Sequence, residues 1–77
     1  MYVIVVYDIG VERINKIRIF LKQYLNWVQN SVFEGEVTKA QLERIKAGLR
    51  KIISDDKDAV IFYQFTDSKW IQRQTMG

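Results

Sequence analysis

Residues 2–7, Tyr-Val-Ile-Val-Val-Tyr, form an unbroken run of β-branched and aromatic residues that ends at Asp8. Such a run is typical of a strand that is buried on both faces and therefore central in its sheet. The run is far shorter than the roughly 20 apolar residues of a membrane span, and no basic segment precedes it. We therefore expect neither a signal peptide nor a transmembrane segment, and a cytoplasmic location.

Two amphipathic helices are predicted from apolar residues that recur every three or four positions. In the first, which follows Gly10, these residues are Ile14, Ile17, Leu21, Tyr24, Leu25 and Val28. The second follows Thr38-Lys39-Ala40-Gln41, which has the spacing of a capping box, and ends near Ser54. Its apolar residues are Leu42, Ile45, Leu49 and Ile52.

The remaining strands are predicted from β-branched and aromatic segments. Residues 27–37 are interrupted by Gly35 and form either one strand or two short strands around a bulge or a tight turn. Residues 59–65 form a further apolar strand after an acidic turn, 55–58, that we expect to be solvated. The tail, 68–77, is expected to be a short edge strand or disordered.

The predicted order of elements is β-α-β-β-α-β, the ferredoxin-like α+β fold. In this fold one antiparallel sheet carries both helices on a single face, and we expect residues 1–77 to form one such domain. The other face then holds apolar strand residues without a covering layer. Because a bare apolar face is unfavourable, the sequence predicts a homodimer that associates through its sheets.

The composition restricts the chemistry that the chain can perform. Its 77 residues include no Cys and no His, which excludes a disulfide framework, a thiol nucleophile, a Ser-His-Asp triad and the common zinc sites. Carboxylates remain as metal ligands, and they select Mg²⁺ or Mn²⁺. A net charge of +3 mildly favours a polyanionic partner such as nucleic acid.

Asp8 is the strongest candidate for a functional residue. It lies where a buried strand gives way to a loop, a place from which a carboxylate can reach a metal ion. The alternative is that Asp8 caps the following helix or closes an Asx turn. Tyr7 would point to the opposite face of the sheet, and we expect it in the core.

A resemblance supports the metal-ligand interpretation of Asp8. The segment Tyr7-Asp8-Ile9 and the later string Val-Gln-Asn-Ser-Val-Phe-Glu-Gly at residues 28–35 resemble the second CRISPR-associated protein family, the small subunit of the CRISPR spacer-acquisition complex. The resemblance implies a ferredoxin-like homodimer that bridges dimers of the spacer integrase. It also implies a Mg²⁺-dependent endonuclease acting on RNA or DNA, in which Asp8 from each subunit shares the metal.

The other candidate residues are assigned partly from the residues and partly from this resemblance. The basic residues Arg13, Lys16, Arg18 and Lys22 lie on the flanks of the first helix and either contact phosphates or form its solvated face. Ser31 is a candidate phosphate or water contact, and Phe33 is expected near the dimer seam. Where the resemblance implies a basic residue before Val-Gln, this chain has Trp27, which either stacks on a base or packs in the core or an interface.

Three functions are compatible with the sequence. The first is a metal-dependent nuclease of the CRISPR adaptation machinery, and the second is a non-catalytic scaffold in the same complex that binds DNA and the integrase. The third is a small nucleic-acid-binding protein outside CRISPR, such as a related ribonuclease toxin. An RRM is disfavoured because the aromatic-basic RNP1 pattern is missing.

Overall fold

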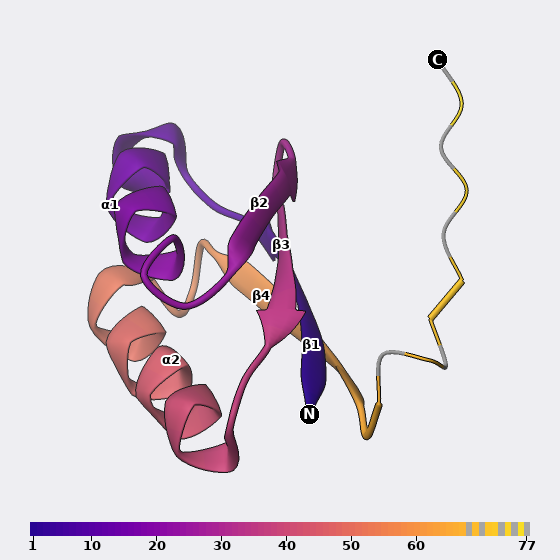
Figure 1. The fold of residues 1–77 in the computed structure, drawn as a ribbon. Helices are drawn as coiled ribbons and strands as arrows, with labels where there is room; N and C mark the ends of the chain where they lie inside the picture. The colour runs from indigo at the N-terminus through magenta and orange to yellow at the C-terminus, as the bar shows by residue number, and fades with distance from the viewer. Residues whose placement is uncertain (68, 70, 73, 75, 77) are drawn as a thin grey trace.

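The order of elements in the chain is β-α-β-β-α-β, as predicted (Figure 1). The computed structural model describes residues 1–67, 69, 71, 72, 74 and 76. Its elements are β1 (Tyr2–Asp8), α1 (Val11–Leu21), β2 (Asn26–Gln29), β3 (Val32–Glu36), α2 (Lys39–Ile52) and β4 (Ala59–Phe65). This arrangement confirms the ferredoxin-like fold.

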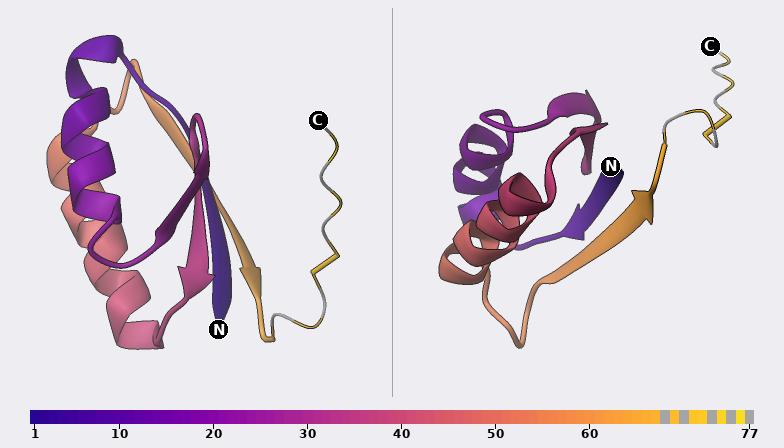
Figure 2. Two further views of the ribbon diagram at one scale, coloured as in Figure 1. Left: turned by 45° about the horizontal axis from the view of Figure 1, so that its top comes forward. Right: turned by 60° about the horizontal axis from the view of Figure 1, so that its bottom comes forward.

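The strands form one antiparallel sheet in the order β2-β3-β1-β4, so the apolar run at the start of the chain is an inner strand. Both helices lie on the same side of this sheet (Figure 2). We call the sheet surface that faces away from the helices the open face. Residues directly opposite one another on neighbouring strands share a face, so the pairing register assigns each strand residue to the helix side or to the open face.

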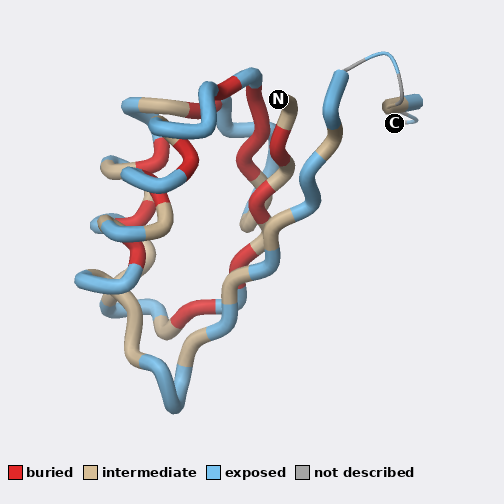
Figure 3. Tube along the Cα trace, turned by 90° about the horizontal axis from the view of Figure 1, so that it is seen from below, coloured by how far each residue is buried: buried red, intermediate tan, exposed pale blue. Residues whose placement is uncertain are grey.

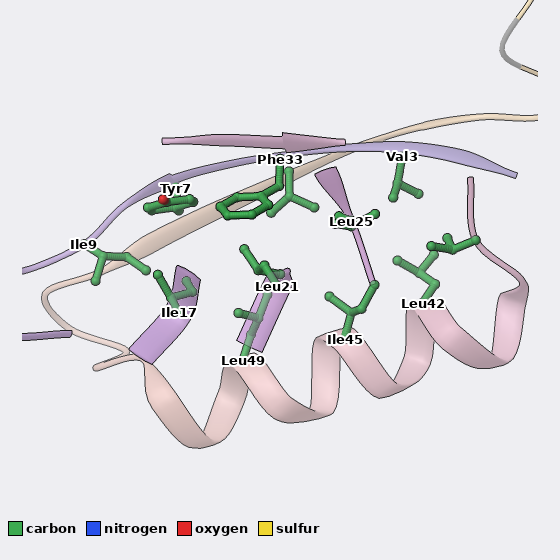
Figure 4. Packing of buried hydrophobic residues seen from close by; sticks show 12 residues of the cluster. Val3, Tyr7, Ile9, Ile17, Leu21, Leu25, Phe33, Leu42, Ile45 and Leu49 are labelled. Atoms are coloured by element: carbon green, nitrogen blue, oxygen red, sulfur yellow. The ribbon is translucent and has the colours of Figure 1, made fainter. Parts of the chain in front are cut away.

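The hydrophobic core lies between the sheet and the two helices (Figure 3). Val3, Val5 and Tyr7 alternate along β1 with residues of the open face and are 0%, 0% and 3% exposed. They meet a layer of helix residues that includes Ile17, Leu21, Leu42, Ile45 and Leu49 (Figure 4). The core position of Tyr7 is therefore confirmed.

Helix α1 ends at Leu21, earlier than its hydrophobic period suggested. Leu25 still packs in the core at 5% exposure, but it lies in the turn after the helix. Val28 lies in β2 and is 40% exposed. The helical spacing of these two residues is therefore a coincidence of a turn followed by a strand, because pairing of β2 with β3 overrides the local pattern.

The segment that could have been one strand or two is a hairpin of β2 and β3. The turn lies at Asn30 and Ser31, and Asn30 adopts a φ of 34°, a conformation that Asn tolerates better than most residues. A bulge interrupts the pairing between Trp27 and Gln29. Gly35 is not in the turn but within β3, where a Cβ atom would lie 3.3 Å from Cδ2 of Leu25.

The predicted capping box at the start of α2 is present. The backbone N–H of Gln41 donates to Oγ1 of Thr38 at 3.1 Å, and the N–H of Thr38 donates to Oε1 of Gln41 at 2.9 Å. These bonds satisfy two amide groups that a helix start leaves unpaired, which explains why α2 begins at Lys39.

In the tail, residues 68, 70, 73, 75 and 77 lie outside the described residues. The expectation of an edge strand or disorder over 68–77 therefore stays a prediction. Within the part of the chain that the structure describes, no helix has the length and apolar character needed to cross a membrane.

Helix α2 approaches α1 closely at Gly48, where a Cβ atom would fall within 3.0 Å of three ring carbons of Phe20. Overpacking of this kind costs ~1–3 kcal/mol, whereas Ala gains about 1 kcal/mol over Gly in helix propensity. We expect Gly48→Ala to lower the free energy of unfolding by about 1 kcal/mol in urea denaturation. The same change in a Phe20→Leu background should be neutral or stabilising, and stabilisation by Gly48→Ala alone would contradict the close approach.

Candidate functional site at the end of the first strand

The side chain of Asp8 is exposed on the open face, at the carboxyl end of the inner strand β1. It is opposite Ala59 of β4, which also belongs to the open face. Among the described residues, none makes a hydrogen bond or ion pair with the Asp8 carboxylate. A rigid inner strand thus presents a carboxylate with its acceptor positions available, as a metal ligand requires.

The alternative that Asp8 caps α1 or closes an Asx turn is wrong in this structure. Gly10 occupies the N-cap position, and no side chain within this helix start provides the capping bond. The N–H of Gly10 instead donates to Oδ1 of Asp58 at 2.9 Å, a residue from the loop between α2 and β4. Because Asp58 binds this amide, the Asp8 side chain makes no capping or turn hydrogen bond in the part of the chain that is described.

Asp58 is the centre of a buried hydrogen-bond cluster. Its side chain is 0% exposed, and it accepts bonds from Nε of Arg13 at 2.6 Å, from Nη2 of Arg13 at 2.8 Å and from the N–H of Ser54 at 2.8 Å. The hydrogen bond from Arg13 holds the pKa of Asp58 well below its ordinary value, and the amides of Ser54 and Gly10 act in the same direction against the effect of burial. The prediction that this acidic turn is solvated is therefore wrong for Asp58, whereas Asp55 and Asp56 are exposed as expected.

All three guanidinium nitrogens of Arg13 donate hydrogen bonds to carboxylates. In addition to the two bonds to Asp58, its Nη1 donates to Oε1 of Glu12 at 2.7 Å. The hydrogen bond to Asp58 raises the pKa of Arg13 above its ordinary value, so the guanidinium stays charged. Phosphate contact by Arg13 stays a prediction, and a phosphate would have to share a guanidinium that already binds two carboxylates.

Arg18 and Ser31 are brought to the same end of the sheet as Asp8, through its neighbour Tyr7. The N–H of Tyr7 donates to the carbonyl of Ser31 at 3.0 Å. The hydroxyl of Tyr7 donates to the carbonyl of Asn30 at 3.1 Å and accepts from Nε of Arg18 at 3.4 Å. Lys16 is exposed on α1, and the phosphate roles of these residues stay predictions.

Phe33 is buried in the core of the chain, and its expected position near the dimer seam stays a prediction. Phe33 is 0% exposed, and its ring centroid lies 6.1 Å from that of Tyr7 on the helix side of the sheet (Figure 4). It pairs with Val5, a core residue of β1, in the sheet register. Its side chain therefore lies on the face of the sheet opposite the open face.

The open face is mainly apolar along β1 and β4. Opposite pairs on this face are Val6 with Ile61, Ile4 with Tyr63 and Tyr2 with Phe65. Ile61 and Tyr63 are each 51% exposed. On β3, Glu34 shares this face but is only 4% exposed, and it accepts a hydrogen bond from the hydroxyl of Tyr2. Sequence reasoning missed this pair, because Glu34 seemed an ordinary acidic residue beside Gly35.

The available donors fit a hard divalent cation that keeps most of its water ligands. Among the described residues, there is no cluster of three or more Asp, Glu, His or Cys side chains that could hold a metal ion. Asp8 therefore offers one exposed carboxylate at the end of β1, a ligand that suits Mg²⁺ or Mn²⁺ better than Zn²⁺. A second carboxylate would have to come from another copy of the chain.

The Asp58 cluster generates a prediction about stability and pH. The folded pKa of Asp58 lies below its unfolded value near 3.8, so its contribution is fully present above that pH and is lost as the pH falls. We expect Asp58→Asn to lower the thermal midpoint at pH 7 and to flatten the decline of stability below about pH 4. Asp55→Asn, in the same loop but exposed, is the control. Equal midpoints for wild type and Asp58→Asn at pH 7 would contradict the prediction.

Known proteins similar to this chain share its sequence over nearly the full length. The family model of CRISPR associated protein Cas2 matches residues 1–73. The "CRISPR-associated endoribonuclease Cas2" of Methanocaldococcus jannaschii is 60% identical, with 100% of this chain and 68% of the relative covered. The protein of that name from Pyrococcus furiosus is 58% identical, with 100% and 88% covered. The crystal structure of Streptococcus pyogenes Cas2 at pH 6.5 has a TM-score of 0.88 and 34% identity, with 100% of both chains covered. This chain belongs to the CRISPR-associated Cas2 family.

Proposed function

We propose that this chain is a Mg²⁺-dependent endonuclease that cleaves phosphodiester bonds of RNA or DNA and acts as a homodimer with the spacer integrase in CRISPR adaptation. The observation that carries the proposal is the Asp8 carboxylate, which is exposed at the end of an inner strand and unengaged by any described residue. The name endoribonuclease, which the relatives from M. jannaschii and P. furiosus bear, agrees with this reaction. Family membership also favours a CRISPR role over a separate ribonuclease toxin.

Asp8 is the residue that would hold the cation. When bound, Mg²⁺ lowers the pKa of a water ligand and offsets the negative charge that develops on the phosphate. Lys16 and Arg18 would bind neighbouring phosphates by charge-assisted hydrogen bonds, and the hydroxyl of Ser31 would add a neutral contact. Tyr7 holds the turn that carries Ser31 through its backbone N–H, which fixes this contact relative to Asp8.

The open face and the lone carboxylate of Asp8 support the proposed homodimer. Exposed side chains such as Ile61 and Tyr63 lie beside half-buried Ile4 and Val6, and together they form an apolar strip along β1 and β4. Association of two such faces would remove the strip from water and bring two copies of the β1 end into one assembly. A second copy of Asp8 would then complete the ligand set.

The non-catalytic scaffold remains a second candidate because of one observation at Asp8. No described residue hydrogen-bonds its carboxylate, so the described part of the chain shows no general base or acid bound to it. A protein that bridges DNA and the integrase would need the basic helices and the dimer but no reaction at Asp8. Metal-dependent cleavage by the purified protein separates the two functions.

The endonuclease function predicts that Asp8→Asn removes Mg²⁺-dependent cleavage. We expect at least a roughly 100-fold loss of cleavage rate, the scale for removal of one charge-stabilising group. The assay uses labelled RNA and DNA with Mg²⁺ and with EDTA, and sedimentation shows whether the dimer is kept. Asp55→Asn is the matched control, since it also removes an exposed carboxylate and should cleave normally. Unchanged cleavage by Asp8→Asn would assign the activity to another site or to a contaminant.

The homodimer predicts that a charge on the open face dissociates the assembly. Ile61→Glu should convert a micromolar dimer into a monomer in analytical ultracentrifugation, because burial of an unpaired carboxylate in the interface is costly. Ile19→Glu is the control, because Ile19 is 68% exposed on α1, in the layer opposite the open face. A wild-type protein that is monomeric at micromolar concentration, or an Ile61→Glu dimer, would contradict sheet-to-sheet association.

A further inference from the structure

Trp27 lies on the edge strand β2 with two cationic side chains over its ring. The guanidinium carbon of Arg18 is 4.9 Å from the centroid of the indole, and Nζ of Lys22 is 5.2 Å from it. The indole remains 47% exposed and is not part of the hydrophobic core. An aromatic ring is thus held in solvent beside two positive charges, which core packing does not require.

Hydrogen bonds fix this ring relative to the end of β1. The Nε1–H group of Trp27 donates to the carbonyl of Asn30 at 2.9 Å. The same carbonyl accepts the bond from the hydroxyl of Tyr7, so one oxygen of the β2–β3 turn binds both aromatic residues. Arg18 completes the cluster, because it donates to Tyr7 and also lies over the indole. The ring is therefore preorganised, which lowers the entropic cost of binding a ligand to it.

The combination of an exposed indole and flanking cations fits one class of ligand. Proteins that bind single-stranded nucleic acid stack bases on aromatic rings and attract the backbone with basic residues. A base in a duplex is already stacked and paired, so its face is not available to a surface tryptophan. A metal ion would be repelled by the two cations, and a small anion would bind them but would gain nothing from the indole.

We propose that Trp27, with Arg18 and Lys22, is a stacking site for an unpaired base of single-stranded RNA or DNA. The inference deepens the proposed function and rests on its premise that the chain binds nucleic acid. Trp27 pairs with Phe33 and so lies on the helix side, whereas Asp8 lies on the open face. Tyr7 directly precedes Asp8 and shares the carbonyl of Asn30 with Trp27, so the indole and the carboxylate lie at the same end of β1. The substrate class is then a single strand or a single-stranded overhang, rather than a continuous duplex.

The test measures binding of fluorescein-labelled 20-nucleotide strands of RNA and DNA, and of the matching duplex, by anisotropy in EDTA. We expect Trp27→Ala to weaken single-strand binding about tenfold, the loss typical of one base stack, and to change duplex binding less than twofold. Trp27→Phe, which keeps an aromatic face, should stay within about threefold of wild type. Lys22→Gln should reduce the salt dependence of binding by about 0.7 in the logarithmic slope.

Matched controls separate stacking from misfolding and from catalysis. Val28→Ala changes the next exposed residue of β2 and should bind as wild type. Thermal unfolding checks that each variant is folded. A Trp70→Phe background leaves Trp27 as the only tryptophan, whose emission a stacked base should quench. Equal losses for Trp27→Ala and Trp27→Phe, equal losses on duplex, or unchanged emission would overturn the stacking site. Because EDTA prevents metal-dependent cleavage, these results stand whether or not Asp8 proves catalytic.

Discussion

The buried carboxylate of Asp58 joins the start of α1 to the loop before β4. It accepts hydrogen bonds from Gly10, from two nitrogens of Arg13 and from Ser54, and its side chain has no exposure to solvent. A buried charge is tolerated because every acceptor direction has a donor, one of them cationic. The chain therefore leaves β1 along a fixed path, and the first amide of α1 is satisfied without Asp8. The Asp8 carboxylate is available because Asp58, rather than Asp8, accepts the hydrogen bond from the N–H of Gly10.

The fold places this carboxylate on the side of the sheet that the helices do not cover. Alternation along β1 sends Val3, Val5 and Tyr7 into the core and leaves Asp8 on the open face. A shift of one residue in the register would bury the carboxylate and expose the core set. The same alternation creates the apolar strip that we propose as the dimer interface. The proposed catalytic group and the proposed assembly surface thus arise from one strand pattern, so selection on either would constrain the other.

Local patterns in the sequence were sufficient to predict most of the fold. The apolar run of β1, the span of β4 and the capping box at Thr38 depend on neighbouring residues, and each was confirmed. The early end of α1 could not be predicted, because it depends on pairing between β2 and β3. The position of Asp8 was found from its place after the strand, but its freedom from capping depends on Asp58, which contacts Arg13 across 45 residues of sequence. The burial of Phe33 on the helix side could not be predicted for a similar reason, since only the register shows which face it occupies.

Tyr7 links Trp27, on the helix side of the sheet, to the strand end that carries Asp8 on the open face. Tyr7 points into the core, yet its hydroxyl shares the carbonyl of Asn30 with the indole of Trp27, while its backbone continues to Asp8 on the open face. The resemblance noted in the sequence implies a basic residue where this chain has Trp27. Here Arg18 and Lys22 of the neighbouring helix segment keep positive charge at that place, and the strand itself contributes an aromatic surface. In the proposed stacking site, this exchange would preserve attraction for phosphate and add an interaction with bases. The ring stays available because it would lose two cation–π contacts and one hydrogen bond if it moved into the core.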